Sequence, residues 1–404
     1  MDPRTRLPVV GMVGAGQLAR MTHQAAIALG QSLRVLAVSA DDPAALVCPD
    51  VVIGEPDDAE ALATFVAGCD VVTFDHEGVP AEPLARIAAS SGDDGVPLRP
   101  DPTALLHAQD KLVMRERLSA FGVPCPPFRA VTEVREVNEF GAEYGWPVVL
   151  KARRGGYDGR GVWMLDSPED AAAVVAEVTA AGTELLVEQR VRMRGEVAAL
   201  VARSPFGQGA AWPVVQTVQQ DGICVEVIAP APDLPEELAE QAERLALDIA
   251  GELGVVGLLA VELFVVDSPA SGEAALLVNE LAMRPHNSGH WTIEGARTSQ
   301  FEQHLRAVLD YPLGDISMTA PVVVMANVLG GDPVPDMALD ERVHHLFARF
   351  PDVKVHLYSK QERPGRKVGH VTVLGEDLTV VQHRARLAAA WLAQARWLDG
   401  EKVH

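Results

Sequence analysis

Short apolar runs alternate with amphipathic stretches along the first quarter of the chain. The apolar runs have the length of buried strands, and the stretches between them repeat hydrophobic residues at helical spacing. We expect strands over residues 7–13, 33–38, 51–53 and 70–74, and helices over residues 18–29, 59–67 and 82–89. Strands that alternate with helices predict a parallel sheet with both faces covered, which is an α/β fold.

The pattern changes after a connector rich in Gly, Asp and Pro at residues 90–102. A helix is expected over residues 104–121, where Gly122 ends it. A small α+β unit should follow over residues 128–188, with a helix at 168–180 and strands at 147–152, 162–165 and 184–189. From residue 197 the chain favours antiparallel strands, expected at 258–266, 274–281, 322–328, 353–357 and 369–374. Helices are expected over 238–253, capped by Gly254, and over 379–397.

Composition limits the classes of partner. The chain has 404 residues, of which 48% are hydrophobic, enough for two or three domains with large cores. Its formal net charge of -22 repels phosphate backbones, so we expect no nucleic-acid partner, and a small anionic substrate needs a local basic pocket. The four cysteines are widely spaced, which argues against a zinc site or a disulfide framework. No apolar run has the length of a signal peptide or a membrane span, so we expect a cytoplasmic protein without a membrane partner.

A glycine turn stands between the first expected strand and the first expected helix. Gly14 and Gly16 would let the backbone approach a phosphate at the helix N-terminus, where amide groups and the helix dipole favour anions. Ala19 occupies the place of the third glycine in the dinucleotide-binding pattern. A tight turn without a ligand explains these residues equally well, so the turn supports a binding role only together with other motifs.

The strongest local signal is the segment from Lys151 to Gly161. It follows an expected strand and contains four glycines and four cations within eleven residues. Glycines let the backbone wrap closely around phosphate oxygens, and the cations neutralise their charge. A solvated hairpin tip is the alternative, but so many cations beside glycines in an acidic protein favour an anion-binding loop.

Two carboxylates, Glu262 and Glu280, lie on expected strands that a loop at residues 267–272 joins. If this hairpin is symmetric about Ser271, the two side chains face each other with β-carbons about 5 Å apart. Such like charges destabilise a sheet unless a cation lies between them, and oxygen ligands on rigid strands suit Mg²⁺. Asn279 could add an oxygen. Two solvent-facing glutamates are the alternative, which the apolar residues around them disfavour.

Two further polar clusters lie close to these strands in the sequence. Residues 284–291, Arg-Pro-His-Asn-Ser-Gly-His-Trp, follow the second carboxylate strand directly, so their side chains should converge on the same site. Residues 360–367, Lys-Gln-Glu-Arg-Pro-Gly-Arg-Lys, precede the last expected strand. Each cluster alone is also compatible with a polar surface loop.

Together these segments resemble the ATP-grasp superfamily, and within it the N5-carboxyaminoimidazole ribonucleotide synthetases, the ATPase subunit of phosphoribosylaminoimidazole carboxylase. The resemblance rests on residues 14–21, 154–161, 279–291 and 363–370, which span nearly the whole chain. It implies a Rossmann-like pre-ATP-grasp domain over residues 1–108, an ATP-grasp domain over 109–300 with a lid at about 128–188, and a mixed C-terminal domain over 301–404 that completes the substrate site.

The resemblance also implies a reaction. ATP drives the carboxylation of 5-aminoimidazole ribonucleotide by bicarbonate, through carboxyphosphate, and gives ADP and phosphate. One or two Mg²⁺ ions and a homodimer are implied as well. Because carboxyphosphate hydrolyses readily, the small lid unit should close over the site and exclude water.

Roles for individual residues follow from the same resemblance. The expected ATP contacts are Lys111, Lys151, Gly156, Glu188, Gln189, Val191, Glu196 and Asn279. The expected Mg²⁺ ligands are Glu262 and Glu280. The expected ribonucleotide contacts are Gly16, Gln17, Leu18, Glu77, Tyr157, Asp158, Arg160, Ser288, Lys360, Arg363, Arg366 and Lys367. The expected catalytic residues are Asp158, which orients the exocyclic amine, and the bicarbonate ligands Arg284, His286 and Asn287.

Three other functions fit part of the pattern. Another ATP-grasp ligase, such as the formate-dependent glycinamide ribonucleotide transformylase, has similar domains but lacks the Gly-Gly-Tyr-Asp-Gly-Arg run. A nicotinamide-dependent oxidoreductase explains the N-terminal turn but neither the facing glutamates nor Lys151. A non-catalytic nucleotide-sensing module is the third alternative.

Overall fold

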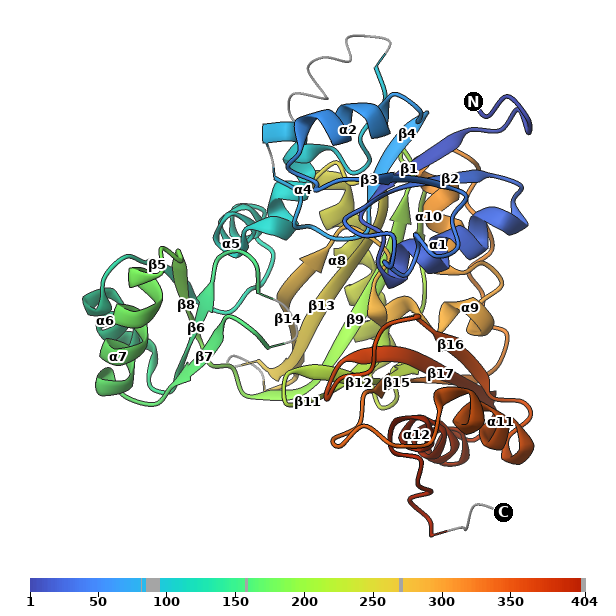
Figure 1. Cartoon of the computed structure of the whole chain (residues 1–404). Helices are drawn as coiled ribbons and strands as arrows, with labels where there is room; N and C mark the ends of the chain where they lie inside the picture. Colours follow the sequence, from blue (N-terminus) through green and yellow to red (C-terminus); the bar gives the residue numbers. More distant parts are fainter. Residues whose placement is uncertain (81, 85–94, 157–158, 269–271, 401–404) are drawn as a thin grey trace.

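The computed structural model describes residues 1–80, 82–84, 95–156, 159–268 and 272–400, which fold around three sheets (Figure 1). A parallel sheet lies near the N-terminus, a long antiparallel sheet runs through the centre, and a small sheet projects to one side. Within the described residues, no helix combines the length and the apolar character that a membrane crossing requires.

The N-terminal sheet has the strand order β3-β2-β1-β4, with all pairs parallel, as the alternating pattern predicts. Its strands are β1 (Val9–Val13), β2 (Ser32–Ala37), β3 (Asp50–Ile53) and β4 (Val71–Phe74), and its own helices are α1 (Gln17–Ala28) and α2 (Ala59–Val66). The sequence pattern did not predict α10 (Gln300–Val308), whose Leu305 and Val308 share a core with β1. The helix expected over residues 82–89 lies mostly outside the described residues.

The central sheet has the order β14-β13-β9-β11-β12-β15-β17-β16, and β10 pairs with β9. Its strands are β9 (Met193–Arg203), β10 (Gly209–Ala211), β11 (Val215–Gln220), β12 (Ile223–Ala229), β13 (Gly257–Asp267), β14 (Ala274–Ala282), β15 (Val322–Leu329), β16 (Lys354–Leu357) and β17 (Lys367–Gly375). All of its pairs are antiparallel, which confirms the expectation for this half of the chain. Because β15, β16 and β17 follow residue 300, the C-terminal region extends this sheet.

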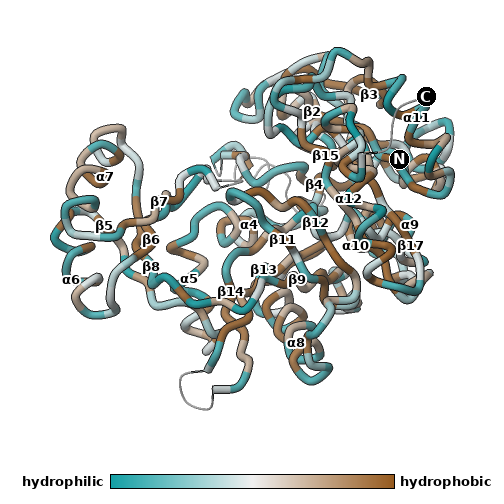
Figure 2. The backbone as a smooth tube through the Cα atoms, turned by 90° about the horizontal axis from the view of Figure 1, so that it is seen from below, coloured by the Kyte–Doolittle hydropathy of each residue, from teal (hydrophilic) through white to brown (hydrophobic). Residues whose placement is uncertain are grey.

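Helices cover the central sheet at both ends. α8 (Glu236–Glu252) packs Leu238, Ala242 and Ile249 into the core beneath β9, β13 and β14, and Gly254 follows it with a φ of +67°, as expected for a helix-ending glycine. α11 (Leu339–Arg349) and α12 (Leu378–Gln394) pack against β15 and β17. Figure 2 shows the long hydrophobic stretches of β9 and β13 inside this assembly.

The projecting unit is a four-stranded sheet in the order β5-β8-β6-β7, covered by two helices (Figure 1). Its elements are β5 (Phe128–Val131), α6 (Val134–Tyr144), β6 (Val148–Ala152), β7 (Val162–Leu165), α7 (Pro168–Ala180) and β8 (Leu185–Gln189). It has a separate core that includes Val137, Phe140, Leu150 and Val187. A unit with its own core and few connections can move as a body, which suits a lid.

The single helix expected over residues 104–121 is wrong, because two helices occupy this segment. α4 (Pro102–Gln109) ends at Asp110, whose backbone is extended, and α5 (Lys111–Ala120) begins after it. The Asp110 carboxylate accepts hydrogen bonds from the amides of Leu112 and Val113, so it caps α5. An aspartate cap inside an apparently continuous helical pattern is the signal that the prediction overlooked.

Candidate functional site

Two glutamates on neighbouring strands form the centre of the candidate site. Glu262 of β13 lies directly opposite Glu280 of β14, so the facing pair expected from the sequence is present. Near the hairpin loop, however, the register is offset from the symmetric one, because Leu263 faces Val278. If that register continued unchanged, Asn279 would face Glu262.

A β-bulge at Asn279 brings Glu280 opposite Glu262. Leu276, Val278 and Leu281 of β14 all point into one core, so a step of three residues replaces the usual step of two after Val278. Asn279 and Glu280 therefore both face away from that core, on the side of Glu262. Three side chains with oxygen ligands share one face of the hairpin.

The charge on this face is unbalanced. Burial, and then the charges of Glu280 and Glu196, raise the pKa of Glu262 well above its usual range. A cation beside the pair would relieve this repulsion, and Lys111 does so in part, since its Nζ lies 2.5 Å from Glu280 Oε1. No cluster of three or more His, Cys, Asp or Glu side chains suited to a metal ion occurs in the described part of the chain.

Lys151 joins this face to the projecting unit through a buried ion network. Its Nζ lies 2.7 Å from Glu188 Oε2 and donates to Asn279 Oδ1 at 3.2 Å. Arg115 donates from Nε to Glu188 Oε1 at 2.6 Å and from Nη1 to the carbonyl oxygen of Val278 at 2.7 Å. The Glu188 carboxylate is thus held by two cations.

Arg115 was missed by the sequence reasoning, although a signal existed. It lies three residues from both Leu112 and Leu118, which are buried on the same face of α5. A cation on an apolar helix face must find a buried partner, because an unpaired buried charge is costly. Glu188, on an expected strand, is that partner.

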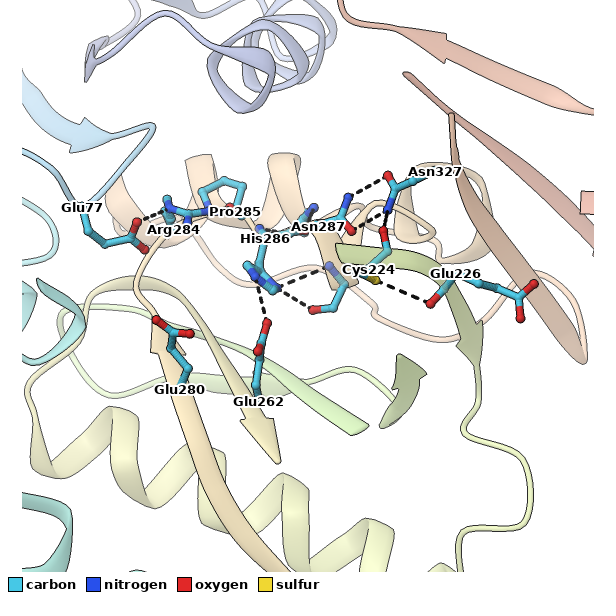
Figure 3. Close-up of polar contacts among 12 residues, drawn as sticks. Glu77, Cys224, Glu226, Glu262, Glu280, Arg284, Pro285, His286, Asn287 and Asn327 are labelled. Carbon is cyan, nitrogen blue, oxygen red and sulfur yellow. Dashed lines mark hydrogen bonds and ion pairs between the residues drawn. The ribbon is translucent and has the colours of Figure 1, made fainter. Parts of the chain in front are cut away.

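The loop after β14 brings its polar side chains to the same place (Figure 3). Arg284 donates from Nε to Glu77 Oε2 at 2.6 Å, which connects the end of the N-terminal sheet to the carboxylate strands. His286 Nε2 lies 3.3 Å from Glu262 Oε1. Asn287 begins the short helix η2 (Asn287–Gly289), ahead of α9 (Thr292–Gly295).

His286 is a neutral imidazole with one defined tautomer. Burial, and then the charges of Arg284 and Lys367, lower the pKa of His286 to about 3. The amide of Ser288 donates to His286 Nδ1 at 3.3 Å, so Nδ1 carries the lone pair and Nε2 carries the proton. That proton points toward Glu262 Oε1, so His286 presents a donor to the site.

The basic cluster at residues 360–367 reaches α1, the helix that follows β1. Lys360 Nζ donates to Gln17 Oε1 at 2.6 Å, which brings together two residues expected to contact the ribonucleotide. Lys367 acts electrostatically on His286, as described above. Arg363 and Arg366 are exposed and contact the side chain and main chain of Gln361.

The N-terminus of α1 already has an anionic partner within the protein. The Asp75 carboxylate accepts hydrogen bonds from the amide of Gly16 and, at 3.1 Å, from the amide of Ala19. Asp75 follows β4 at the same sheet edge as the glycine turn, which the alternating pattern could have indicated. Gly16 therefore gives its amide to Asp75, while Leu18 is buried against Phe301 and Tyr358.

The glycine-rich segment has backbone positions that only glycine suits. A Cβ on Gly156 would lie 2.8 Å from the carbonyl oxygen of Arg160, and Gly161 has a φ of +70°. Arg153 and Arg154 bind the Asp110 carboxylate, so two of the four cations hold the loop to α5. Arg160 is exposed, and Tyr157 and Asp158 lie outside the described residues.

Family models match most of the chain. Residues 7–109 match the ribonucleotide synthetase preATP-grasp domain, residues 116–301 match the ATP-grasp domain, and residues 323–384 match the phosphoribosylaminoimidazole carboxylase C-terminal domain. The chain is 63% identical over 397 residues to the N5-carboxyaminoimidazole ribonucleotide synthase of Mycobacterium tuberculosis, covering 98% of this chain and 90% of that protein.

Solved structures give the same result. The N5-carboxyaminoimidazole ribonucleotide synthetase from Thermus thermophilus has a TM-score of 0.82 at 36% identity, covering 96% of this chain and 99% of that one. The N5-carboxyaminoimidazole synthase from Aspergillus clavatus, in complex with ADP and 5-aminoimidazole ribonucleotide, has a TM-score of 0.84 at 29% identity, covering 95% and 98%.

Proposed function

The chain belongs to the N5-carboxyaminoimidazole ribonucleotide synthase family, and from this membership we propose how its residues divide the work of the reaction. The protein is an ATP-dependent carbon–nitrogen ligase of purine biosynthesis that converts 5-aminoimidazole ribonucleotide to its N5-carboxy derivative, with ADP and phosphate as products. The matches give no support to a glycinamide ribonucleotide transformylase or a nicotinamide-dependent oxidoreductase.

Bicarbonate supplies the carbon in this proposal. A bicarbonate oxygen attacks the γ-phosphorus of ATP, the bond to the bridging oxygen breaks, and ADP leaves with the electron pair. Carboxyphosphate then divides into CO₂ and phosphate. The exocyclic nitrogen attacks CO₂ and loses one proton, which gives the carbamate. Phosphorylation is needed because bicarbonate itself is a poor electrophile.

The observation that carries the function is the facing pair Glu262 and Glu280, with Asn279 on the same side of the hairpin. Two carboxylates and one amide oxygen fit a Mg²⁺ ion whose remaining ligands are phosphate oxygens and water. The raised pKa of Glu262, which follows from burial and from its carboxylate neighbours, fits a face that needs a cation. When bound, Mg²⁺ would neutralise charge on the β- and γ-phosphates.

ATP lies between this face and the lid. Lys151 and Lys111 contact its phosphates, and Lys111 exchanges Glu280 for a phosphate oxygen. Gly156 lets the loop backbone approach the phosphates. Because Arg115 and Lys151 hold the Glu188 side chain, the adenine is lined by main-chain groups of the segment after it. The residues of that segment are Gln189 and Val191, and Glu196 contacts the ribose hydroxyls.

Arg284, His286 and Asn287 hold bicarbonate and then carboxyphosphate. Glu77 fixes Arg284 through Nε, and Nη1 also donates to the carbonyl oxygen of Pro285 at 3.1 Å, so Nη2 is the guanidinium nitrogen proposed to bind an anion. Because His286 is neutral, it can donate its Nε2 proton to the anion without placing a positive charge next to the metal ligands. Ser288 keeps His286 oriented through Nδ1. All three residues thus present donors, which is the chemistry an oxyanion requires.

The ribonucleotide site lies beside the basic cluster at residues 360–367. Lys360 and Gln17, which share a direct hydrogen bond, form the centre of this site. Asp158 is proposed to orient the exocyclic amine. The further contacts that we propose are Gly16, Leu18, Glu77, Tyr157, Arg160, Ser288, Arg363, Arg366 and Lys367. A homodimer is proposed on family membership alone.

The test of the function is phosphate release by the purified protein. It should require ATP, Mg²⁺, 5-aminoimidazole ribonucleotide and bicarbonate together, and one ribonucleotide should be carboxylated per phosphate released. Isotope-labelled bicarbonate should appear in the product. Phosphate release that continues at full rate with formate, or without the ribonucleotide, would contradict the proposal.

Replacing Lys360 with Ala should raise the KM for 5-aminoimidazole ribonucleotide by about 10- to 100-fold, because a charge-assisted hydrogen bond to phosphate is lost. The KM values for ATP and bicarbonate should stay within about twofold. Lys354→Ala, which removes an exposed lysine of β16, is the matched control and should leave all three values unchanged. An unchanged ribonucleotide KM in Lys360→Ala would remove Lys360 from the substrate site.

A further inference from the structure

Asn327, on β15, makes a reciprocal amide pair with Asn287 (Figure 3). Asn287 Nδ2 donates to Asn327 Oδ1 at 3.0 Å, and Asn327 Nδ2 donates to Asn287 Oδ1 at 2.8 Å. Asn327 Nδ2 also donates to the carbonyl oxygen of Cys224 at 2.8 Å. Asn327 is only 5% exposed, so these contacts are made in a buried environment.

The main-chain carbonyl of Cys224 fixes the orientation of both amides. A carbonyl oxygen can only accept, so the nitrogen of Asn327 must face it. The two hydrogens of that nitrogen are then both used, one on Cys224 and one on Asn287 Oδ1. Turning either amide around would place oxygen against oxygen. Asn287 is therefore held with its oxygen toward Asn327 and keeps one N–H outside the pair.

The position of Cys224 explains why its carbonyl is available. β12 pairs with β15 only from Glu226 to Ala229, and Cys224 lies two residues before this ladder begins. The side chain of Asn327 thus takes the place of a main-chain donor at the end of the ladder. The orientation of Asn287 is therefore set by the backbone of the central sheet and not by the segment that carries it.

We propose that Asn327 is a positioning residue for the bicarbonate site: it fixes the Asn287 amide so that a donor faces the oxyanion. This inference rests on the proposed function, in which Asn287 binds bicarbonate or carboxyphosphate. It adds to the site a residue of β15, a strand that lies outside the segment carrying Glu280, Arg284 and His286. A freely rotating Asn287 would present its oxygen as often as its nitrogen and would repel an anion in that state.

The test is steady-state kinetics of Asn327→Asp, which keeps the shape of the side chain but removes both donor hydrogens. The KM for bicarbonate should rise by about 10- to 100-fold, the range expected for losing one oriented hydrogen bond to a charged ligand. The KM values for ATP and the ribonucleotide should change by less than about threefold. Asn327→Ala, which removes the side chain without adding charge, should give the same pattern.

Two comparisons separate positioning from loss of stability. Val328→Ala leaves a cavity in the neighbouring core, on the opposite face of β15. It should lower the melting temperature while leaving the bicarbonate KM unchanged. In Asn287→Ala, adding Asn327→Ala should cause no further rise in the bicarbonate KM, because both act through one amide.

Either an unchanged bicarbonate KM in both Asn327 variants or additive effects in the double variant overturns the proposal. Equal increases in all three KM values would also overturn it, since they indicate general distortion. A wild-type protein whose phosphate release does not depend on bicarbonate would instead remove the proposed function, and this inference with it.

Discussion

Replacing Glu280 with Gln should lower kcat for phosphate release by about 10²- to 10⁴-fold, because a metal ion that balances phosphate charge contributes several kcal/mol to the transition state. The substitution preserves volume and the fold of β14 but removes one of the two charges that face each other. The Mg²⁺ concentration needed for half-maximal rate should rise at the same time. Initial rates across a Mg²⁺ titration, at saturating ATP, ribonucleotide and bicarbonate, measure both effects.

The matched control is Asp267→Asn at the far end of the same hairpin, where the carboxylate pairs with Arg194 in an exposed position. Like Glu280→Gln, it removes one negative charge from the hairpin, but from the loop end of β13. It should leave kcat and the Mg²⁺ requirement unchanged. Glu280→Gln with normal turnover and normal Mg²⁺ dependence would show that the facing pair does not hold the catalytic ion.

Replacing Arg115 with Met should lower the free energy of unfolding by about 3 kcal/mol, at the low end for a broken buried ion pair because Lys151 still pairs with Glu188. The variant also loses the hydrogen bond to the Val278 carbonyl, one residue before the bulge. Denaturant unfolding at neutral pH measures the loss. Arg135→Met is the control, since its pair with Glu139 is exposed to solvent and its loss should change the free energy of unfolding far less.

The pH dependence identifies the electrostatic part of this loss. Burial alone would raise the pKa of Glu188, but the charges of Lys151 and Arg115 outweigh it and lower the pKa to about 2. A carboxylate with a lowered folded-state pKa contributes stability that is complete above its ordinary pKa and is lost as the pH falls toward the folded value. The deficit of Arg115→Met relative to wild type should therefore shrink between about pH 4.5 and pH 2. A deficit that stays constant over this range would indicate lost packing and not lost charge.

The sequence predicted the central feature of the site through a pattern that is local. Glu262 and Glu280 stand on two apolar strands with a short loop between them, so a hairpin and a facing pair could be expected. The reason for the pairing could not be predicted. The register set at the loop leads to Asn279, and only the bulge restores Glu280. The sequence pattern does not predict this bulge, because the bulge depends on how β14 packs against β13 and α8.

The contacts that support the site depend on pairings between distant segments. Arg115 and Glu188 are 73 residues apart, and Asn287 and Asn327 are 40 apart. Periodicity places each residue on a helix face or a strand, but it does not say which buried donor meets which acceptor. Asn327 in particular is a lone polar residue in an apolar strand, and the sequence does not indicate which residue its side chain contacts. The reaction follows from family membership, whereas these contacts follow only from the folded structure.

The central claim is that the face formed by Glu262, Asn279 and Glu280 binds the metal–nucleotide unit. Its most direct test is a crystal structure of the protein with ADP and Mn²⁺ in place of Mg²⁺, with the ion located by anomalous scattering. The account predicts a peak within coordination distance of both glutamate carboxylates and of the nucleotide phosphates. A peak bound only to phosphate, with the two glutamates directed elsewhere, would contradict it.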